Sequence, residues 1–295
     1  MFVFSHTKKG KLAFVLLSSY LRHKNNNSLL ITICKLIMPL LASVISTDNL
    51  SSKAMKPYYL ILLIFFSVNS LAESVIPNIE IVKLKDNIFL HKSFRYVQEY
   101  GLVSANGLII IENKQAFIID TPWSIQDTKK LVNWIKSNGY ELKGSISTHS
   151  HTDRTTGIKF LNNHSVPTYA MSLTNQILKD NKQELATVSF DKTPFTLANG
   201  LIEVFYPGHG HTIDNVVIWL PKSKILFGGC LIRSLDSKSL GYTGEADIQQ
   251  WSGSIENIIS TYPNIATVIP GHGEFGDNSL LQHTINISKS TKSNN

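Results

Sequence analysis

Cysteine is scarce in this chain, and its scarcity, together with the balance of the other residues, excludes several protein classes. Only Cys34 and Cys230 occur in 295 residues, so a framework of disulfide bonds is excluded. Charged residues make up only 17% of the chain against 43% apolar residues, which is typical of a globular protein rather than a disordered or fibrous one. Low-complexity linkers are missing after residue 72, so we expect a single domain there.

A basic excess is missing from most of the chain. Residues 1–72 hold eight Lys and Arg and a single Asp, whereas residues 73–295 hold 20 basic and 20 acidic residues. Proteins that bind nucleic acid through a charged face need a cluster of positive charge on it. The sequence therefore gives no support for nucleic-acid binding.

The N-terminal segment has the parts of an export signal. Lys56 is followed by an apolar run over residues 58–66 and then by small residues up to Ala72. This order is typical of a secretory signal peptide that is cleaved after Ala72. We predict a signal peptide over residues 55–72, beginning at Met55, and we interpret residues 1–54 as an upstream, non-native extension.

A long apolar run is also missing. The run over residues 58–66 is shorter than the roughly 20 residues that a membrane-spanning helix needs. We therefore expect residues 73–295 to form one exported domain, a monomer in the periplasm with no stable membrane anchor after signal cleavage. A membrane anchor made from residues 29–66 is the alternative that the sequence leaves open.

The hydrophobic pattern after residue 72 predicts strands followed by helices, twice over. Strands are expected near residues 79–84, 107–112, 115–120, 145–147, 201–206, 215–220, 224–227 and 267–269. Helices are expected to begin after Ser124 and Asp247, which match the capping pattern of a helix N-terminus. This order is typical of two packed sheets with helices outside them.

Ligand-type side chains gather where the predicted strands end. These side chains are His149, His151, Asp153, His211, Cys230 and His272. In extended chain, residues two apart project to the same side, so His149, His151 and Asp153 are expected to form one row. Imidazole, carboxylate and thiolate are the ligands that zinc takes, and a catalytic zinc site keeps one position for water. The sequence therefore predicts a zinc site, to which either His209 or His211 contributes.

The chain from residue 79 onward resembles a class B metallo-β-lactamase of the subclass that uses a cysteine ligand. The matching runs are IDTPW (Ile119–Trp123), SISTHSHTD (Ser145–Asp153), PGHGHTIDNVVIWLP (Pro207–Pro221), LFGGC (Leu226–Cys230) and IPGHGE (Ile269–Glu274). The resemblance implies an α+β fold, a four-layered αββα sandwich of two mixed β-sheets with helices on both outer faces.

The resemblance also implies two Zn²⁺ ions per chain. The first would be held by His149, His151 and His211, and the second by Asp153, Cys230 and His272. The spacing of the residues by itself predicts the ligand group of the first ion. The division of the ligands between two ions is implied only by the family resemblance. The family pattern, Gly-His-Thr followed by Asp-Asn, favours His211 over His209.

The activity that the resemblance implies is hydrolysis of the β-lactam amide bond by a metal-bound hydroxide, giving resistance to penicillins, cephalosporins and carbapenems. Asp153 is the expected catalytic residue, because it could orient the hydroxide and assist proton movement. A glyoxalase II-like thioesterase and a non-catalytic zinc-binding protein are the alternatives. Such thioesterases typically carry a His after the Asp, where this chain has Arg154.

Three residues are expected to contact the substrate. Arg233 stands where related enzymes use a Lys to hold the substrate carboxylate, and a guanidinium can form a bidentate pair there. Tyr242 stands where many relatives carry Asn. By resemblance, residues 91–106 form a mobile loop over the substrate, with the aromatic side chains Phe94, Tyr96 and Tyr100. The sequence leaves open which of the three touches the substrate, and Tyr100 is our candidate.

Overall fold

The computed structural model of the protein describes residues 76–293. The predicted signal peptide (55–72) and upstream extension (1–54) lie outside the described residues. Among the helices of residues 76–293, none combines the length and the apolar character that a membrane crossing requires.

The first sheet has seven strands in the order β1-β2-β3-β4-β5-β6-β7. Their bounds are β1 (Glu80–Lys85), β2 (Ile88–Val97), β3 (Gly101–Glu112), β4 (Gln115–Ile119), β5 (Glu141–Ile146), β6 (Thr168–Met171) and β7 (Val188–Phe190). Strands β1 to β4 pair antiparallel, and β4 to β7 pair parallel, so the sheet is mixed.

The second sheet has five strands in the order β12-β11-β10-β9-β8. Their bounds are β8 (Phe195–Leu197), β9 (Ile202–Phe205), β10 (Val217–Leu220), β11 (Ile225–Gly229) and β12 (Thr267–Pro270). The pairs from β8 to β11 are antiparallel, and the pair of β11 and β12 is parallel.

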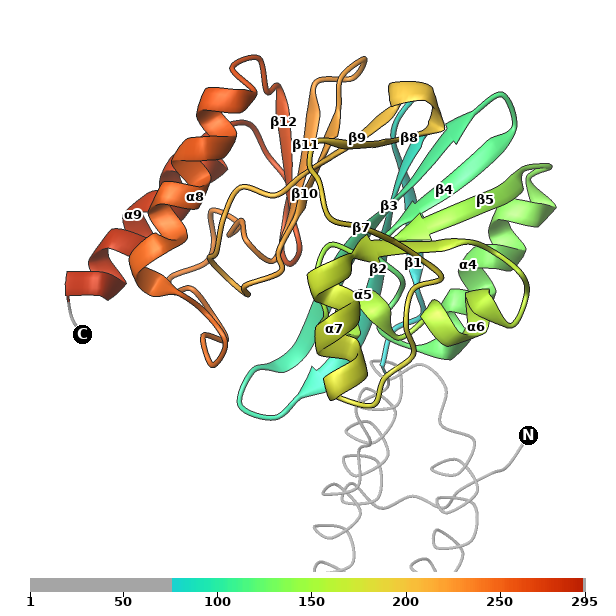
Figure 1. The fold of residues 1–295 in the computed structure, drawn as a ribbon, viewed down its shortest axis with the longest axis horizontal. Helices are drawn as coiled ribbons and strands as arrows, with labels where there is room; N and C mark the ends of the chain where they lie inside the picture. Colours follow the sequence, from blue (N-terminus) through green and yellow to red (C-terminus); the bar gives the residue numbers. More distant parts are fainter. Residues whose placement is uncertain (1–75, 294–295) are drawn as a thin grey trace, which may run out of the picture. The chain divides into compact units, whose positions relative to one another are not determined.

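Helices cover the outer side of each sheet. They are α4 (Ile125–Ser137), α5 (Thr152–Thr155), α6 (Ile158–Asn162), α7 (Ser172–Asp180), α8 (Ile248–Thr261) and α9 (Ser279–Ser293), with a 3₁₀ turn η3 (Ala198–Gly200). In Figure 1, α4 and α6 lie beside β4 and β5, whereas α8 and α9 lie on the far side of the second sheet. The four-layered αββα arrangement with two mixed sheets is therefore confirmed.

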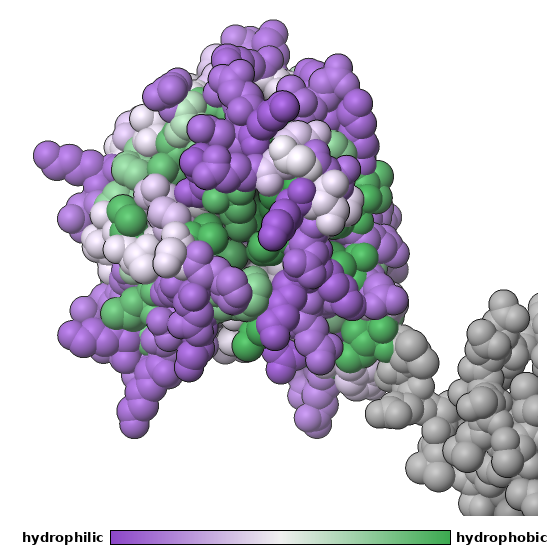
Figure 2. All heavy atoms as spheres, turned by 90° about the vertical axis from the view of Figure 1, so that its right-hand side faces the viewer, coloured by the Kyte–Doolittle hydropathy of each residue, from purple (hydrophilic) through white to green (hydrophobic). Residues whose placement is uncertain are grey.

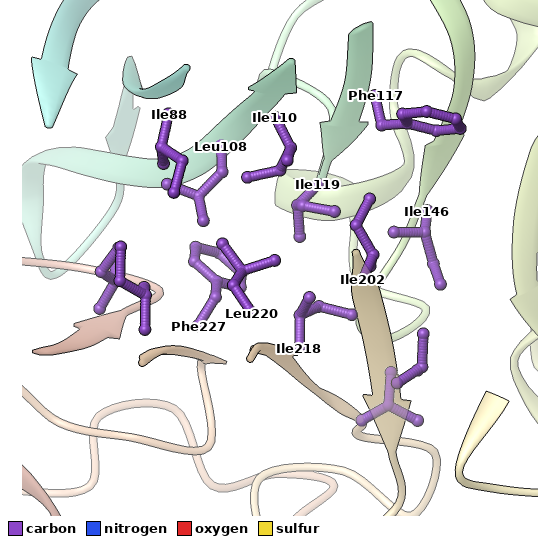
Figure 3. Close-up of a cluster of buried hydrophobic side chains, with 14 of the residues drawn as sticks. Ile88, Leu108, Ile110, Phe117, Ile119, Ile146, Ile202, Ile218, Leu220 and Phe227 are labelled. Carbon is purple, nitrogen blue, oxygen red and sulfur yellow. The ribbon is translucent and has the colours of Figure 1, made fainter. Parts of the chain in front are cut away.

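Strand β3 shows why its sequence is apolar without interruption. Leu108 and Ile110 point into the core between the two sheets, where they face Ile218 and Phe227 in Figure 3. Ile109 and its alternate neighbours instead pack against the outer helix α4. A strand that is buried on both faces has no polar face, so the usual alternation of apolar and polar residues disappears. The surface on the α4 side is mostly hydrophilic, with smaller apolar areas between (Figure 2).

Helix α4 begins and ends as its sequence predicts. The Ser124 side chain accepts a hydrogen bond from the Asp127 backbone N–H at 3.0 Å. Leu131 and Ile135 are fully buried on the inner face of the helix. Gly139 follows the C-cap with φ +77°, a backbone conformation that residues with a Cβ rarely adopt. Local capping signals thus fix both ends of this helix.

The segment 91–106 is not a loop, contrary to the expectation from the sequence. Strands β2 and β3 pair residue by residue from Ile88 opposite Ile110 to Val97 opposite Gly101, and only the turn at 98–100 is unpaired. The aromatic and β-branched residues of this segment favour a strand. The segment therefore forms an extended β-hairpin.

Candidate metal centre

The ligand-type side chains predicted from the sequence meet at one edge of the two sheets. His149 follows β5 at the end of the first sheet, and His211 lies between β9 and β10 of the second. Cys230 directly follows β11, and His272 lies two residues after the end of the parallel strand β12. Because the carboxyl ends of parallel neighbours lie at the same edge, the last two side chains reach one space. They line a cavity of about 420 Å³ together with His151, Asp153 and His211.

The row predicted for His149, His151 and Asp153 is only partly extended. His151 has an extended backbone with φ −66° and ψ 152°, and it is the N-cap of the short helix α5. Asp153 lies in the first turn of that helix rather than in a continued strand. The carboxylate still reaches the same space, because the chain turns into α5 immediately after His151.

Three imidazoles form the first part of the ligand cluster. The ring centroids of His149, His151 and His211 lie 4.7 to 4.9 Å apart, and the Nε2 atom of His211 lies 3.1 Å from Nδ1 of His151. Burial, reinforced by the neighbouring imidazoles, lowers the pKa of His149 and of His211 well below the usual value. Both rings are therefore neutral at pH 7 and offer lone pairs.

A carboxylate, a thiol and a fourth imidazole form the second part. The Nε2 atom of His272 lies 3.2 Å from Oδ2 of Asp153 and 3.3 Å from Sγ of Cys230. The Sγ of Cys230 lies 3.5 Å from the same carboxylate oxygen. Ligand atoms of His149, Asp153 and Cys230 all lie within 4.8 Å of one another, so this part adjoins the three imidazoles.

Arg154 is a fully buried cation beneath the second part of the cluster. Its Nη2 atom lies 2.8 Å from Oδ2 of Asp153 and 3.0 Å from Sγ of Cys230. Its Nη1 atom donates to the Asn106 carbonyl at 2.6 Å and lies 3.3 Å from the Asp120 carboxylate. The sequence indicated Arg154 only as a difference from other hydrolases, and nothing in its local pattern signals these contacts.

The charge states around Arg154 follow from burial and from this cation. Burial raises the pKa of Asp153, but the Arg154 charge opposes burial, and that pKa lies well below its usual range. Burial raises the pKa of the Cys230 thiol, and Arg154 only partly opposes that effect. The thiol therefore keeps its proton at pH 7 in the absence of a metal, and metal binding releases that proton.

Outer hydrogen bonds orient two of the imidazoles toward the cluster. His272 donates from Nδ1 to the Ser104 carbonyl at 2.7 Å, which leaves the Nε2 lone pair facing Cys230. The Nε2 atom of His151 lies 2.8 Å from the Glu245 carboxylate, which leaves Nδ1 facing His211. Such outer partners fix the tautomer of a metal-ligating histidine. The contact of Glu245 with His151 could not be predicted, because no local pattern connects residues 94 positions apart.

The donor set fits a metal ion. The buried Nε2 atom of His149 has no hydrogen-bond partner among residues 76–293. Because a buried polar atom normally has a partner, this nitrogen is free to bind a metal ion. Neutral imidazoles, an ionised carboxylate and a thiol that loses its proton on metal binding suit zinc. His209 stands outside the cluster, with Nδ1 3.7 Å from the Asp247 carboxylate. The structure thus brings His211, and not His209, to the cluster.

The three residues predicted to contact substrate all line the cavity. Arg233 is half-buried beside Gly241, its Nε atom has no partner, and it forms no ion pair within residues 76–293. Tyr242 is 53% exposed, and its ring meets His151 edge-on at 5.9 Å. Tyr100 is 55% exposed at the turn of the β2–β3 hairpin. The indole of Trp123, which the sequence analysis did not single out for substrate, also lines the cavity.

Known proteins resemble this chain across the residues that build the cluster. A model of the Metallo-beta-lactamase superfamily matches residues 100–272, a range that includes all six ligand-type side chains. A curated metallo-beta-lactamase type 2 from Pseudomonas aeruginosa is 44% identical over 230 residues, which cover 78% of this chain and 92% of that protein.

Solved structures of metallo-beta-lactamases also resemble this chain. The metallo-beta-lactamase DIM-1, crystallised after exposure to ceftazidime, is 59% identical with a TM-score of 0.73, and the match covers 73% of this chain and 99% of that one. TMB-1 is 56% identical with a TM-score of 0.72, over 74% of this chain and 100% of that one.

Proposed function

Since the chain belongs to the metallo-β-lactamase superfamily, we propose that it hydrolyses the amide bond of β-lactam antibiotics. The observation that carries this proposal is the convergence of four imidazoles, a carboxylate and a thiol at the edge of one open cavity, which all but His149 line. Penicillins, cephalosporins and carbapenems are the proposed substrates, and antibiotic resistance is the proposed consequence.

Two Zn²⁺ ions per chain are the proposed cofactors. His149, His151 and His211 would hold the first, and Asp153, Cys230 and His272 the second. When bound, zinc supplies Lewis acidity and lowers the pKa of a water molecule to about 7. The orphaned Nε2 atom of His149 and the outer hydrogen bonds of His151 and His272 support this assignment.

The chain's own residues would position the reactants. Arg233 has no ion-pair partner within residues 76–293, so its guanidinium is available for the substrate carboxylate. Tyr100, Trp123 and Tyr242 form aromatic walls that exclude water from the bound substrate. Asp153 is ionised, so its carboxylate can accept a hydrogen bond from the attacking water and orient it.

Export and assembly are part of the same proposal. A signal peptide over residues 55–72 would deliver residues 73–295 to the periplasm as a monomer without a membrane anchor. The small residues before Glu73 support the cleavage site. Mass spectrometry of the N-terminus of the exported protein tests this prediction.

The two alternative functions are those of a glyoxalase II-like thioesterase and of a non-catalytic zinc-binding protein. Arg154 occupies the position after Asp153 where glyoxalase II-like thioesterases typically carry a His, and it contacts Asp153 and Cys230 directly. A zinc-storage protein would enclose its metal with protein ligands, whereas this cluster faces a cavity of about 420 Å³. Both observations favour β-lactam hydrolysis.

The decisive experiment compares zinc-loaded protein with protein treated with dipicolinate. We expect the zinc-loaded protein to open benzylpenicillin, a cephalosporin and a carbapenem, and the chelator to abolish all three activities. Steady-state absorbance of the β-lactam ring measures the rates. Intact rings in every case, with cleavage of S-lactoylglutathione instead, would show that the protein is a thioesterase.

A further inference from the structure

Helix α7 ends in a rigid turn beside the ligand cluster. The Gln183 N–H donates to the Leu178 carbonyl at 2.8 Å, and the Lys182 N–H donates to the Lys179 carbonyl at 3.0 Å. This pair of bonds is a Schellman motif, in which Lys182 takes the left-handed position with φ +55°. The motif fixes where the chain leaves the helix, and so it fixes the position of the Gln183 backbone.

Two amide side chains from this turn line the same cavity as the ligand cluster. They belong to Asn181 and Gln183, and neither has a role in holding the metal ions. Both are neutral, so they differ in chemistry from the guanidinium of Arg233 and from the aromatic walls. A primary amide offers both a hydrogen-bond donor and an acceptor.

The carbonyl oxygen of the Gln183 side chain is unsatisfied. Its Oε1 atom is buried and has no hydrogen-bond partner among residues 76–293. A buried acceptor without a partner destabilises the folded state. The terminal torsion of a Gln side chain is broad, so rotation about it can turn this oxygen toward the cavity. An N–H donor from a bound molecule would satisfy it.

This amide and Arg233 line the same cavity from different layers of the fold. Arg233 follows β11, and its backbone N–H donates to Thr284 of α9, so it belongs to the layers of the second sheet. Helix α7 follows β6 of the first sheet, whereas α9 lies beside the second sheet (Figure 1). A substrate whose carboxylate binds Arg233 and whose ring lies at the ligand cluster would occupy this cavity, and Gln183 forms another part of its lining.

We propose that Gln183 determines specificity by binding the acylamino side chain of penicillins and cephalosporins. The N–H of that side chain would donate to Oε1 of Gln183, and Asn181 would lie at the outer end of the acyl group. This inference rests on the proposed function. It makes a selective prediction, because carbapenems carry a hydroxyethyl group, and no amide N–H, at the equivalent ring carbon.

The test is the near-isosteric variant Gln183→Met in the zinc-loaded protein. We expect KM for benzylpenicillin and for an acylamino cephalosporin to rise about two- to tenfold, which corresponds to one lost hydrogen bond. The kcat values for these substrates and both constants for imipenem are expected to change less than twofold. Zinc content and melting temperature are expected to match those of the unaltered protein.

The matched control is Gln176→Met. Gln176 lies on the exposed side of α7, where its amide donates to Asp180 at 3.0 Å, and it does not line the cavity. We expect this variant to change none of the constants. Unchanged KM values in Gln183→Met, or an equal rise for imipenem, would overturn the assignment. Failure of the unaltered protein to open any β-lactam would instead refute the proposed function itself.

Discussion

Arg154 balances the buried negative charge beneath the ligand cluster. Its side chain is fully buried, and it contacts the carboxylates of Asp120 and Asp153 and the sulfur of Cys230. A buried charge is tolerated only when it is paired and hydrogen-bonded, and this guanidinium meets that condition on several sides. The arrangement keeps Asp153 ionised and close to Cys230 and His272, so these side chains are held together before any metal binds.

His91 is a second buried group whose chemistry depends on its surroundings. It donates from Nε2 to the Asp120 carbonyl at 3.0 Å, and it is only 1% exposed. The ring packs directly against Gly107, and a Cβ at that position would overlap it. Gly107 is therefore required by close approach rather than by backbone conformation. The sequence analysis gave His91 no role as a ligand, and the structure places it outside the cluster.

The pH dependence of stability should reveal this buried imidazole. Burial lowers the pKa of His91 from 6.5 to about 4, so between these values the unfolded chain binds a proton that the folded protein does not. Stability is therefore lost as the pH falls from 6.5 toward 4. We expect the variant His91→Gln to lose about 2 kcal/mol less unfolding free energy between pH 7 and pH 5 than the unaltered protein.

Urea unfolding of the zinc-free proteins at both pH values measures this difference. Burial raises the pKa of Asp120 to about 6, which acts in the opposite direction, but this contribution is common to both proteins and cancels in the comparison. The matched control is His164→Gln, which removes an exposed imidazole. An equal change in that control would contradict the assignment to burial.

Short connections between elements carry most of the chemistry. The ligand-type side chains lie in the turns that follow β5, β9, β11 and β12, and the strands are buried and rigid on both sides of those turns. Helix α8 adds a further connection, because Glu245 lies two residues before its N-cap and contacts His151. A change at the cap can therefore reach the ligand cluster through the backbone.

The N-cap of α8 offers a test of that connection. Asp247 accepts hydrogen bonds from the N–H groups of Gln249 and Gln250 at 2.9 and 3.0 Å. We expect Asp247→Ala to lower the free energy of unfolding by about 1 kcal/mol, because two donors lose their partner. We also expect weaker zinc binding, because Glu245 is then held less firmly against His151.

Ser124→Ala is the matched control, since it removes the cap of α4 instead. Urea unfolding should show a loss of about 1 kcal/mol for this variant also. Competition with a chromophoric chelator measures zinc affinity in both variants. Equal zinc affinity in the two would argue against a mechanical link between the α8 cap and His151.

At the scale of the whole molecule, the ligand cluster joins the two sheets. His149, His151 and Asp153 come from the first sheet, and the other ligand-type side chains come from the second. The core between the sheets is apolar, as Figure 3 shows. It holds the sheets together through buried apolar area, which is not specific to the edge where the ligand cluster lies. Metal ions at the edge would therefore cross-link the two halves.

Zinc removal should consequently lower the stability of the folded protein. A ligand that binds only the folded state at a free concentration of one hundred times its Kd stabilises that state by about 2.7 kcal/mol. For a chain of this size we expect the melting temperature to fall by about 5–10 °C when a chelator removes zinc. Differential scanning calorimetry with and without chelator, followed by zinc restoration, measures the change.

The variant Cys230→Ser should be compared with the unaltered protein in the same zinc-removal experiment. A hydroxyl is a far poorer zinc ligand than a thiolate, so this variant should bind the second ion weakly and recover only part of the lost melting temperature. The zinc-free forms of both proteins should melt at similar temperatures. Retention of two zinc ions by the variant, with full recovery, would contradict the role assigned to Cys230.

Local sequence determined the elements whose signals lie within a few residues. The caps Ser124 and Asp247 define where α4 and α8 begin, because a cap bonds to N–H groups two or three residues away. Spacing alone brought His149 and His151 to one side of the chain. The four-layered fold followed from the order of elements and from the family resemblance, and the structure confirms it.

Only the tertiary structure decided which distant groups meet. Arg154 contacts Cys230 and Glu245 contacts His151 across 76 and 94 residues, and no periodicity in the sequence encodes such distances. The β2–β3 hairpin escaped prediction because its aromatic residues fit a loop over a site as well as a strand. The proposed role of Gln183 in substrate binding likewise depends on the tertiary structure, because the end of α7 brings this residue to the cavity. These features depend on how the sheets and helices pack, because packing, and not local propensity, sets which side chains share a buried space.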